Sequence, residues 1–379
     1  MKVLLIGGTG VLSSEVLKQC VTNNFETYII NRGNRKYLIP EKVKLLKADI
    51  NDDKKIINLI DGVYFDVVID FLCYTEKQIE HSISLFNKSC QQFIFISSAI
   101  VYKETKGIII EDFPLINPKW NYSINKVACE RKLISLCKEY NINYTIIRPG
   151  VTYGNTRIPY GFMPTYGFHW TLVARMLNNK PIITWNGGNN ISAITHVEDF
   201  TVGLIGLIGN KLAYNEAYHI VGDEYYKWID VINILEKILK KKAIIIDIPK
   251  EFLAEEFPCR KGEILGGRSV DLKFNNSKLK KIVPNFTNTI SLAEGIQKTI
   301  VYYKQNNYLN GIDYSFDGNI DRIIKKYITS NKKLIKTTYN TSYIDYLDEK
   351  KIRNKIIYLI AKFKDLYLVK VPLVLIKKL

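Results

Sequence analysis

The chain has 379 residues, of which 47% are hydrophobic and 24% are charged, and this balance is typical of a globular protein with a sizeable core. Its length allows one large α/β unit and a smaller lobe. No stretch approaches the ~20 consecutive apolar residues that a membrane-spanning helix needs. The sequence starts directly with a strand pattern and a glycine turn, so we expect a cytoplasmic protein.

The formal net charge of +17 is concentrated in the last part of the chain. Residues 321–379 contain 15 Lys and Arg against 5 Asp and Glu, whereas the first 320 residues contain 39 and 32. Such an excess could attract nucleic acid or another anionic partner. Because most of it belongs to a tail, we do not expect nucleic acid to be the main partner.

Six cysteines are scattered without any CxxC pair, so we predict neither a disulfide framework nor a metal site. Reduced thiols fit a cytosolic enzyme. Cys73 ends a predicted strand close to the expected ligand crevice, and we interpret it as a small buried apolar residue.

The first 150 residues alternate short apolar runs with amphipathic stretches such as Ser13–Asn23 and Lys54–Ile60. The runs are Val3–Ile6, Thr27–Ile30, Val43–Leu46, Asp66–Phe71, Phe93–Ile96 and Tyr144–Ile147. Fully apolar strands separated by helices are typical of a parallel sheet that is covered on both faces. The sequence therefore predicts an α/β fold of the Rossmann type, doubly wound, with its ligand crevice at the carboxyl ends of the strands.

A smaller, mostly carboxyl-terminal lobe is expected to follow, because the pattern loosens after Gly150 and residues 155–195 are rich in Gly, Pro, Tyr and Trp. We predict a helix after His196–Asp199, a strand at Ala217–Val221 and an amphipathic helix over 228–241. The expected domains are a dinucleotide-binding domain (1–154 with about 196–222), a substrate-binding lobe (about 155–195 and 223–310) and a basic extension (311–379).

The extension contains a stretch whose apolar residues fall on one helical face. These residues are Ile352, Ile356, Leu359, Ile360, Phe363 and Tyr367. Lys351, Lys355 and Lys362 flank that face. We expect this helix to dock on the protein's own body or on a partner subunit. Contact with an anionic membrane surface and nucleic-acid binding are the alternatives.

A glycine-rich turn joins the first strand to the first helix, where glycines let the backbone approach a pyrophosphate and the helix terminus offers N–H groups. The residues predicted to bind a dinucleotide here are Gly7, Gly8, Thr9, Gly10, Val11 and Leu12. Ser13 stands where the fingerprint has its third glycine, which weakens close helix–strand packing but adds only a small side chain.

The end of the second strand favours NADP over NAD. An acidic residue there would bind the ribose 2′-hydroxyl of NAD, whereas this chain has Asn31, Arg32 and Arg35, and arginine pairs well with phosphate. Asp49 after the third strand is a candidate acceptor for the adenine amino group. Ile50 and Phe71 belong to the same predicted cofactor-binding set.

Ser98, Tyr122 and Lys126 form the strongest candidate for catalysis. Tyr122 and Lys126 are four residues apart on a predicted helix, so both can address one pocket. Tyrosine, with an unperturbed pKa of about 10, is a poor base at neutral pH, and a nearby cation favours its phenolate form. Ser98 can hydrogen-bond a substrate oxygen while Tyr122 takes or gives a proton, and Lys126 can also hold the nicotinamide ribose.

The chain resembles the extended short-chain dehydrogenases/reductases of the NAD(P)-dependent nucleotide-sugar epimerase/dehydratase family. The matching segments are GGTGVLS, ADIND, FIFISSAIVY, YSINK, IIRPGVTYG and ITHVEDF. The resemblance implies bound NAD(P), a catalytic triad of Ser98, Tyr122 and Lys126, and a nicotinamide bordered by Pro149 and Val151. It also implies a nucleotide-sugar substrate contacted by residues of about 155–270, and a homodimer formed through the helix that carries Tyr122.

The expected reaction is epimerisation through a keto-sugar intermediate, as in polysaccharide biosynthesis. An NADPH-dependent keto-sugar reductase of the same family is the alternative. A 4,6-dehydratase is disfavoured, because Ala99 and Ile100 stand where dehydratases carry an acidic pair beside the triad hydroxyl. From another class, the chain also resembles, more loosely, the chloroplast stem-loop RNA-binding proteins. We interpret His196 as structural, and Arg148 as either a support of the cofactor crevice or half of a buried ion pair.

Overall fold

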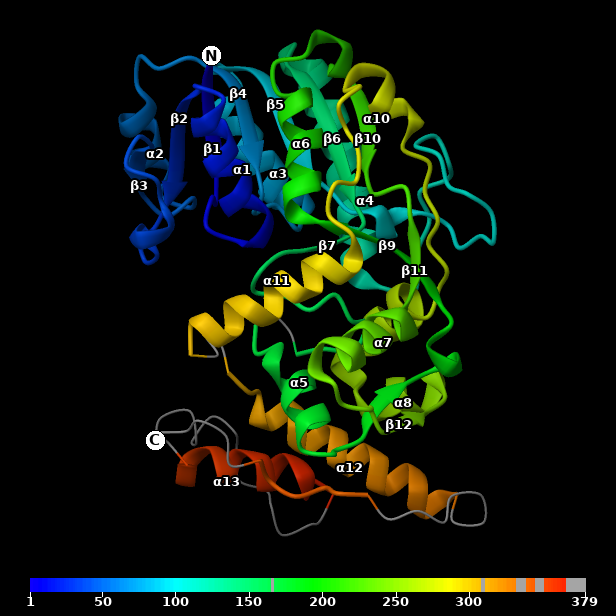
Figure 1. Ribbon diagram of the computed structural model, residues 1–379. Coiled ribbons are helices and arrows are strands. Elements are labelled where there is room, and N and C mark those ends of the chain that lie inside the picture. The colour runs from blue at the N-terminus through cyan, green and yellow to red at the C-terminus, as the bar shows by residue number, and fades with distance from the viewer. Residues whose placement is uncertain (165–166, 308–310, 332–338, 345–350, 366–379) are drawn as a thin grey trace. The chain divides into compact units, whose positions relative to one another are not determined.

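The computed structural model describes residues 1–164, 167–307, 311–331, 339–344 and 351–365, and its chain divides into two compact units (Figure 1). The first unit comprises Met1–Gly154, Ile191–Tyr226 and Val270–Leu292. The second comprises Asn155–Asn190, Lys227–Ser269 and Ala293–Leu379. The sequence prediction assigned residues 270–292 to the substrate-binding lobe. In the structure they pack with the first unit, because Leu279, Val283 and Phe286 lie in its core.

A seven-stranded parallel sheet forms the centre of the first unit, in the order β10-β6-β5-β4-β1-β2-β3. Its strands are β1 (Lys2–Ile6), β2 (Glu26–Asn31), β3 (Lys44–Lys47), β4 (Phe65–Asp70), β5 (Cys90–Ile96), β6 (Asn143–Pro149) and β10 (Glu216–Ile220). All six strands expected in the first 150 residues are confirmed, as is the strand near Ala217. The α/β doubly wound fold is therefore confirmed as well.

Helices cover both faces of this sheet (Figure 1). On one face lie α1 (Val11–Thr22), α6 (Val197–Leu207) and α10 (Ser277–Ile282), and on the other lie α2 (Asp53–Ile60), α3 (Glu76–Phe86) and α4 (Asn121–Tyr140). Alternate residues of each strand serve opposite faces: Val3 and Leu5 pack with α1, whereas Leu4 and Ile6 pack toward α2 and α3. Both cores consist of buried side chains, mostly aliphatic and aromatic with some cysteines, and their burial supplies the main stabilisation of the unit.

A second, three-stranded sheet follows β6 and has the order β11-β9-β7. Its strands are β7 (Val151–Tyr153), β9 (Ile191–His196) and β11 (Tyr225–Lys227). Gly150 joins β6 to β7 at a point where the backbone passes so close to β9 that a Cβ atom would lie 2.6 Å from the Ala193 carbonyl oxygen. The chain therefore needs glycine at this position.

The second unit is mainly helical, with one parallel strand pair, β8 (Ile182–Thr184) and β12 (Ile245–Asp247). Its helices are α5 (Trp170–Leu177), α7 (Trp228–Leu239), α8 (Lys250–Glu256), α9 (Lys261–Glu263), α11 (Leu292–Gln305), α12 (Tyr314–Ser330) and α13 (Lys351–Lys362), of which α11 starts at the last residue of the first unit. Gly161 packs on two buried indoles, Trp185 and Trp228, and a Cβ there would lie 2.8 Å from Trp185. None of the helices in the described ranges is long and apolar enough to cross a bilayer.

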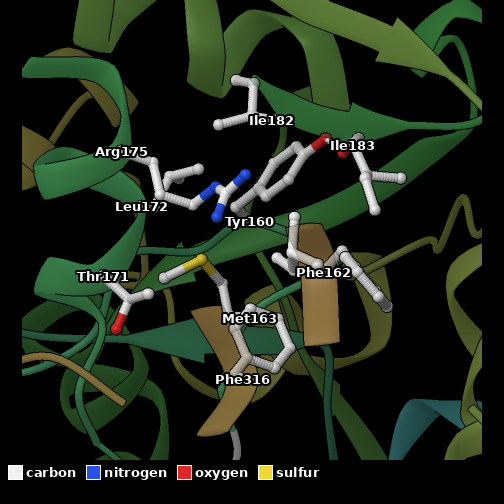
Figure 2. Close-up of a pocket in the computed structure, with 10 residues that line it drawn as sticks. Tyr160, Phe162, Met163, Thr171, Leu172, Arg175, Ile182, Ile183 and Phe316 are labelled. Carbon is white, nitrogen blue, oxygen red and sulfur yellow. Dashed lines mark hydrogen bonds between the residues drawn. The ribbon is translucent and has the colours of Figure 1, made fainter. Parts of the chain in front are cut away.

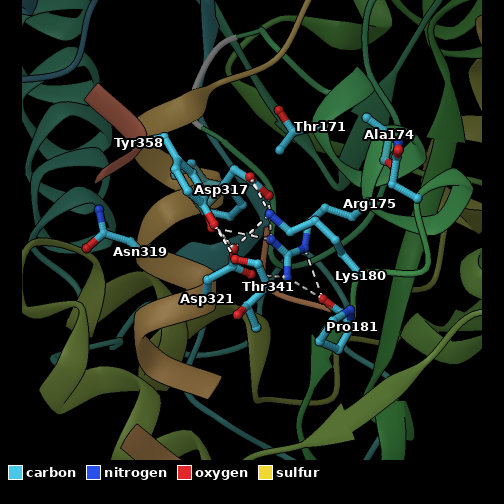
Figure 3. A network of polar contacts seen from close by, with 12 residues as sticks. Thr171, Ala174, Arg175, Lys180, Pro181, Asp317, Asn319, Asp321, Thr341 and Tyr358 are labelled. Atoms are coloured by element: carbon cyan, nitrogen blue, oxygen red, sulfur yellow. Dashed lines mark hydrogen bonds and ion pairs between the residues drawn. The ribbon is translucent and has the colours of Figure 1, made fainter. Parts of the chain in front are cut away.

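A buried ion cluster inside the second unit consists of Arg175, Lys180, Asp317 and Asp321 (Figure 3). Lys180 Nζ lies 2.6 Å from Asp317 Oδ2 and 2.7 Å from Asp321 Oδ2. Arg175 binds both carboxylates, at 2.9 Å for Asp321, and also donates to the Pro181 carbonyl. Each charge is compensated and hydrogen-bonded, as a buried charge requires.

Helix α13 packs on α12 through Tyr358 and Ala361, which are both buried. The Tyr358 hydroxyl donates to Asp321 Oδ2 at 2.6 Å, so this helix is tied to the ion cluster (Figure 3). The face predicted from apolar spacing is a different one: Ile352 is 78% exposed, and Ile356 and Leu359 are exposed as well. Tyr367, assigned to that face from the sequence, lies outside the described residues.

Candidate functional site

The strand order reverses between β1 and β4, so the loops that follow these two strands frame a crevice at the carboxyl edge of the sheet. The loop after β1 contains Gly7 and Gly8. Gly7 has φ +85°, and a Cβ there would lie 2.6 Å from Leu72 Cγ; at Gly8 it would lie 2.5 Å from Ile29 Cδ1. The positive φ favours glycine at the first position, whereas a Cβ at the second would meet the end of the Ile29 side chain. The bare backbone at both positions suits the close approach of a pyrophosphate.

The amino terminus of α1 follows this turn, with Gly10 as its N-cap and Val11 and Leu12 in the first helical turn. Ser13 is buried, and its Oγ accepts a hydrogen bond from the Gly10 N–H at 2.9 Å. The hydroxyl therefore occupies the space of the third glycine and takes up one donor of the turn. The remaining N–H groups of this helix terminus, together with Thr9, fit a dinucleotide pyrophosphate.

The loop after β2 is basic and is connected to the glycine turn. Asn31 Oδ1 accepts from the Gly33 N–H at 2.8 Å, and the Arg35 guanidinium donates to the Thr9 carbonyl at 3.3 Å. The Lys47 side chain passes Gly33, where a Cβ would lie 3.2 Å from Lys47 Cε. Arg32 is exposed on the same loop. These cations favour a phosphate group near the end of β2.

Asp49 is exposed after β3 and is held by Asn51, whose backbone N–H and side-chain amide donate to its carboxylate at 3.0 and 2.9 Å. The hydrogen bond from the Asn51 backbone is the main cause that lowers the pKa of Asp49. The Asn51 side chain and the Arg32 charge act in the same direction. A carboxylate kept ionised in this way can accept from an amino group.

The four remaining predicted cofactor residues follow or end strands of the first unit. Ile50 and Phe71 are half-buried after β3 and β4, and the Phe71 N–H donates to the Ile6 carbonyl at 3.2 Å. Pro149 ends β6 and Val151 begins β7. Each lies at or just after the carboxyl end of a parallel strand of the large sheet, which is where this fold binds ligands.

Ser98 and Tyr122 are both half-buried, in adjoining segments. Ser98 follows β5 and caps a short 3₁₀ turn, its Oγ accepting from the Ile100 N–H at 3.4 Å. Tyr122 lies in the first turn of α4, and the next residue, Ser123, donates its hydroxyl to the Ile100 carbonyl at 2.9 Å. This hydrogen bond fixes the start of α4 against the turn that carries Ser98.

Lys126 is only 2% exposed and lies beneath the Tyr122 ring, with its ammonium 5.8 Å from the ring centroid. It donates to the Cys73 carbonyl at 2.6 Å and to the Ile96 carbonyl at 2.8 Å, which leaves one of its three donors. Burial lowers the pKa of Lys126 from 10.5 to about 8, so the group is still mainly protonated at neutral pH. Tyr122 and Lys126 are thus brought together, as their spacing predicted.

A second buried network supports the residues beside the triad. Arg148 forms an ion pair with Glu130 at 2.7 Å, and Glu130 Oε1 accepts from the Ser97 hydroxyl at 2.5 Å. Glu130 lies one helical turn after Lys126, and Ser97 directly precedes Ser98. Of the two interpretations left open for Arg148, the structure therefore has the buried ion pair.

The network continues through Tyr102 to His219. Arg148 donates to the Tyr102 hydroxyl at 2.5 Å, so the Tyr102 hydrogen points to His219 Nε2 at 2.6 Å, and His219 Nδ1 donates to the Asn275 carbonyl at 2.9 Å. Burial lowers the pKa of His219 to about 3, which matches a neutral ring accepting at Nε2. Tyr102 and His219 were missed in the sequence because they are 117 residues apart.

His196 has the structural role expected of it, as the N-cap of α6, where its Nδ1 accepts from the Glu198 N–H at 3.4 Å. The Asp199 carboxylate binds the Thr289 N–H and hydroxyl at 3.0 and 2.6 Å. No group of three or more His, Cys, Asp or Glu in the described ranges is arranged to hold a metal ion.

A small pocket lies inside the second unit between α5, β8 and α12 (Figure 2). Its walls are mostly apolar, with the Arg175 guanidinium and the Tyr160 ring on one side, and the Tyr160 hydroxyl donates to the Ile183 carbonyl at 2.7 Å. The space has room for about one water molecule. It is therefore too small to be a sugar site in this form.

Comparison with known proteins places this geometry in a family. The model of the NAD dependent epimerase/dehydratase family matches residues 3–220, a span that includes the glycine turn and all three triad positions. The chain belongs to this family. It is therefore an NAD(P)-binding Rossmann enzyme of the epimerase and oxidoreductase class.

Several members of this family resemble the chain. It is 25% identical over 339 residues to a putative UDP-glucose 4-epimerase of Methanocaldococcus jannaschii, covering 80% of this chain and 99% of that protein. It is 26% identical over 266 residues to a chloroplast stem-loop binding protein of Arabidopsis thaliana, covering 66% and 67%.

Among solved structures, a UDP-glucuronic acid 4-epimerase from Bacillus cereus, in complex with UDP-glucuronic acid and NAD, matches with a TM-score of 0.66 and 22% identity. The match covers 81% of this chain and all of that one. At this level of identity, the likeness supports the fold of the family.

Proposed function

We propose that this protein is a nucleotide-sugar epimerase that oxidises a carbinol carbon to a ketone and reduces it again from the other face. The observation that carries the proposal is the buried Lys126 ammonium beneath the Tyr122 ring, beside the Ser98 turn. Proton transfer at a hydroxyl requires a base whose charged form is supported, and a cation beside a phenol provides this support.

In the proposed mechanism, Ser98 holds the substrate hydroxyl oxygen and Tyr122 removes its proton. Lys126 stabilises the phenolate form that Tyr122 must have before it accepts this proton, and the Cys73 and Ile96 carbonyls keep the Lys126 ammonium in place. The dinucleotide, when bound, supplies the hydride acceptor and later the hydride donor. Tyr122 then returns the proton after the keto sugar has turned over.

Elimination of water is not part of the proposal. The residues after Ser98 are Ala99 and Ile100, and both are buried in the 3₁₀ turn. Neither carries an acid or base that could remove a second proton or protonate a leaving hydroxyl. The chain is therefore assigned to epimerase or reductase chemistry within the family.

The proposed cofactor preference is NADP. Arg32, Arg35 and Lys47 are gathered at the loop after β2, and Asn31 ends the strand in place of an acid. We expect NADP to bind more tightly than NAD, and Arg32→Ala/Arg35→Ala to weaken NADP with little change in NAD. Lys36→Ala, from the same loop, is the matched control. Equal loss of both cofactors would contradict the preference.

A keto-sugar reductase is the alternative within the family, because NADPH normally serves as a consumed reductant. Denaturing the purified protein and identifying the released dinucleotide separates the two functions. An epimerase retains its dinucleotide and interconverts sugars without added reductant. A reductase releases oxidised cofactor in proportion to the sugar reduced.

RNA binding is the alternative from another class, favoured by the +17 charge and by the likeness to the stem-loop binding protein. Binding of this kind falls steeply with salt, and it should be lost on removal of residues 321–379, which contain much of the charge excess. If the protein does not bind a stem-loop RNA, or binds it with an affinity that does not change with salt, this alternative is eliminated.

We also propose a homodimer, assembled through the outer faces of α3 and α4, which pack on each other. The outer face of α4 exposes Ile124 and Ile134 to solvent. A second copy would bury both side chains. Sedimentation of the wild type and of an Ile124→Asp/Ile134→Asp variant tests this assembly, and a monomeric wild type would contradict it.

We propose that the exposed face of α13 contacts an anionic membrane surface. The proposed location of the protein is the cytoplasm. Ile352, Ile356 and Leu359 form its apolar stripe, and residues 351–365 contain five Lys or Arg against one Asp. Flotation should occur with anionic but not with neutral vesicles, and Ile352→Ser/Ile356→Ser should abolish it. No flotation of the wild type would contradict the proposal.

A further inference from the structure

The turn between β4 and α3 contains a buried carboxylate that the proposed mechanism does not use. Asp70 ends β4 and is 1% exposed. Its Oδ1 accepts from the Leu72 and Cys73 N–H groups at 2.7 and 3.1 Å, and its Oδ2 accepts from the Ser82 hydroxyl and the Cys73 thiol at 2.6 and 3.0 Å. These donors are all neutral, so this buried anion is hydrogen-bonded but has no cation among its hydrogen-bond partners.

Lys126 has the complementary environment. Its ammonium is bound by the carbonyls of Cys73 and Ile96 and faces the rings of Tyr74 and Phe95 at 4.7 and 4.8 Å. The two charges therefore bind the same residue: Asp70 receives the N–H and thiol of Cys73, and Lys126 binds its carbonyl. Opposite charges that share a buried site stabilise each other, because little water screens them.

The other acidic groups around the Lys126 ammonium are either neutral or already paired with another cation. Burial lowers the pKa of Lys126, whereas Cys129, Cys73, Asp70 and Glu130 act in the opposite direction. Burial also raises the pKa of the Cys73 thiol, and that of Cys129 to about 11, so both thiols are neutral at working pH. Glu130 is already paired with Arg148. Asp70 is thus the negative charge in this group that remains for Lys126.

The same turn also positions an aromatic residue at the catalytic site. Tyr74 follows Cys73 directly and is 42% exposed, and its ring lies 6.3 Å from the Tyr122 ring. The Tyr74 face toward Lys126 adds a cation–π contact to the two carbonyl hydrogen bonds. Loss of the Asp70 hydrogen bonds would therefore move both a ligand of the ammonium and the ring beside Tyr122.

We propose that Asp70 is a positioning residue for the catalytic site: it holds the Asp70–Tyr74 turn against Lys126 and supplies the buried negative charge that keeps this ammonium in place. The inference rests on the proposed role of Lys126 in supporting Tyr122. Asp70 itself acts through Cys73 and Tyr74, and we assign it no contact with substrate.

Asp70→Asn is the informative variant, because an amide retains the shape of the carboxylate. Its oxygen can still accept from the Leu72 and Cys73 N–H groups, and its NH₂ group can donate to the Ser82 hydroxyl. The backbone hydrogen bonds of the turn are therefore kept while the charge is removed, and only the Cys73 thiol loses its acceptor. Asp66→Asn is the matched control. It removes one carboxylate charge from the same strand, but near the start of β4 rather than at its end. There Asp66 accepts a hydrogen bond from the Lys2 N–H at 2.6 Å.

The first readout is the alkaline limb of the pH profile of kcat/KM, which reports the free enzyme. In the wild type, activity should fall as Lys126 loses its proton. Asp70→Asn should move this limb down by about one pH unit, the lower end of what a nearby opposite charge produces. Asp66→Asn should leave it in place. An unchanged limb in Asp70→Asn, or equal movement in both variants, would overturn the proposal.

The second readout needs no substrate and stays valid if the assigned reaction is wrong. Unfolding is measured at pH 7 for the wild type, Asp70→Asn, Lys126→Met and the double variant. The drop in melting temperature caused by Asp70→Asn should be clearly larger when Lys126 is present than in the Lys126→Met background. Equal drops in the two backgrounds would overturn the proposed coupling, whatever the activity of the variants.

Discussion

Two buried lysines, one in each unit, are stabilised in opposite ways. Lys180 lies between two aspartates at 2.6 and 2.7 Å, in an ion cluster shared with Arg175. Lys126 is equally buried, yet its hydrogen bonds go to carbonyls, and its neighbours are aromatic faces. In the first arrangement, two carboxylates compensate the ammonium charge by direct contact. The second leaves the ammonium with one donor and a pKa of about 8, within reach of physiological pH.

This difference indicates different uses for the same side chain. Direct ion pairs fix geometry, and the Lys180 cluster uses them to connect α5 and β8 with α12 and, through Tyr358, with α13. An ammonium whose hydrogen bonds go to neutral carbonyls keeps more electrostatic influence over its surroundings than one bound directly by two carboxylates, because its charge is compensated only from a distance. Lys126 can therefore act on Tyr122, whereas Lys180 acts on the fold.

The comparison predicts that Lys126→Met lowers turnover by about 10²–10⁴-fold, the range in which positioned proton-transfer groups contribute. Without the ammonium, the Tyr122 phenolate loses its support. Steady-state assays of sugar interconversion measure the effect. Lys132→Met is the control, since Lys132 is half-buried on the same helix and pairs with Glu80 at 2.7 Å. Similar rates in both variants would contradict the assignment.

Asp321→Ala should lower the free energy of unfolding by about 3–5 kcal/mol, because two buried cations would then share one carboxylate. Denaturant titration followed by circular dichroism measures the change. Glu255→Ala, an exposed acidic residue on α8 in the same unit, should have little effect. A loss below about 1 kcal/mol for Asp321→Ala would mean that the cluster does not hold the second unit together.

The stability of the protein should depend on pH through Lys126. Its pKa is about 8 when folded and 10.5 when exposed, so between these values the unfolded chain binds more protons and stability rises with pH. As the pH rises across this interval, the free energy of unfolding of the wild type should therefore increase by up to about 3 kcal/mol relative to that of Lys126→Met. Unfolding curves of both proteins at several pH values provide the test. Parallel pH dependence would show that Lys126 is not perturbed.

The smallest expected effect belongs to the edge of the ion cluster. Tyr358→Phe removes one hydrogen bond to the Asp321 carboxylate and should lower stability by about 2 kcal/mol. Thermal unfolding measures this. Tyr327→Phe on α12 is the control: the Tyr327 ring packs on Phe252 at 5.3 Å, and this variant should lower stability less than Tyr358→Phe does. If both variants behave alike, the Tyr358 hydroxyl does not anchor α13.

The parts of the molecule that were predicted correctly have local signals. The strands of the large sheet are continuous apolar runs, and each run maps onto one strand with its ends moved by a few residues. The Tyr122 and Lys126 pair was found because four-residue spacing on a helix brings side chains together. Ser98 was found because it lies in the short segment just after a strand, two residues beyond Ile96.

The parts that were missed depend on contacts between distant segments. The ion cluster joins Arg175 to Asp317 across 142 residues, so no local pattern reveals it. On α13, apolar spacing indicated the wrong face, since the helix is held by the Tyr358 hydroxyl and by Ala361 against Gly318. Asp70 did carry a signal: a carboxylate at the carboxyl end of an apolar strand, beside the crevice where this fold binds ligands.

The most direct test of the proposed function is rapid mixing of the dinucleotide-loaded protein with nucleotide sugars, followed by the absorbance of reduced nicotinamide. With its substrate, the wild type should form reduced nicotinamide transiently and then lose it as the sugar is reduced again. Tyr122→Phe, carrying the same amount of dinucleotide, should show no such signal. A transient of equal size and rate in Tyr122→Phe would contradict the assignment of Tyr122 as the proton-transfer residue.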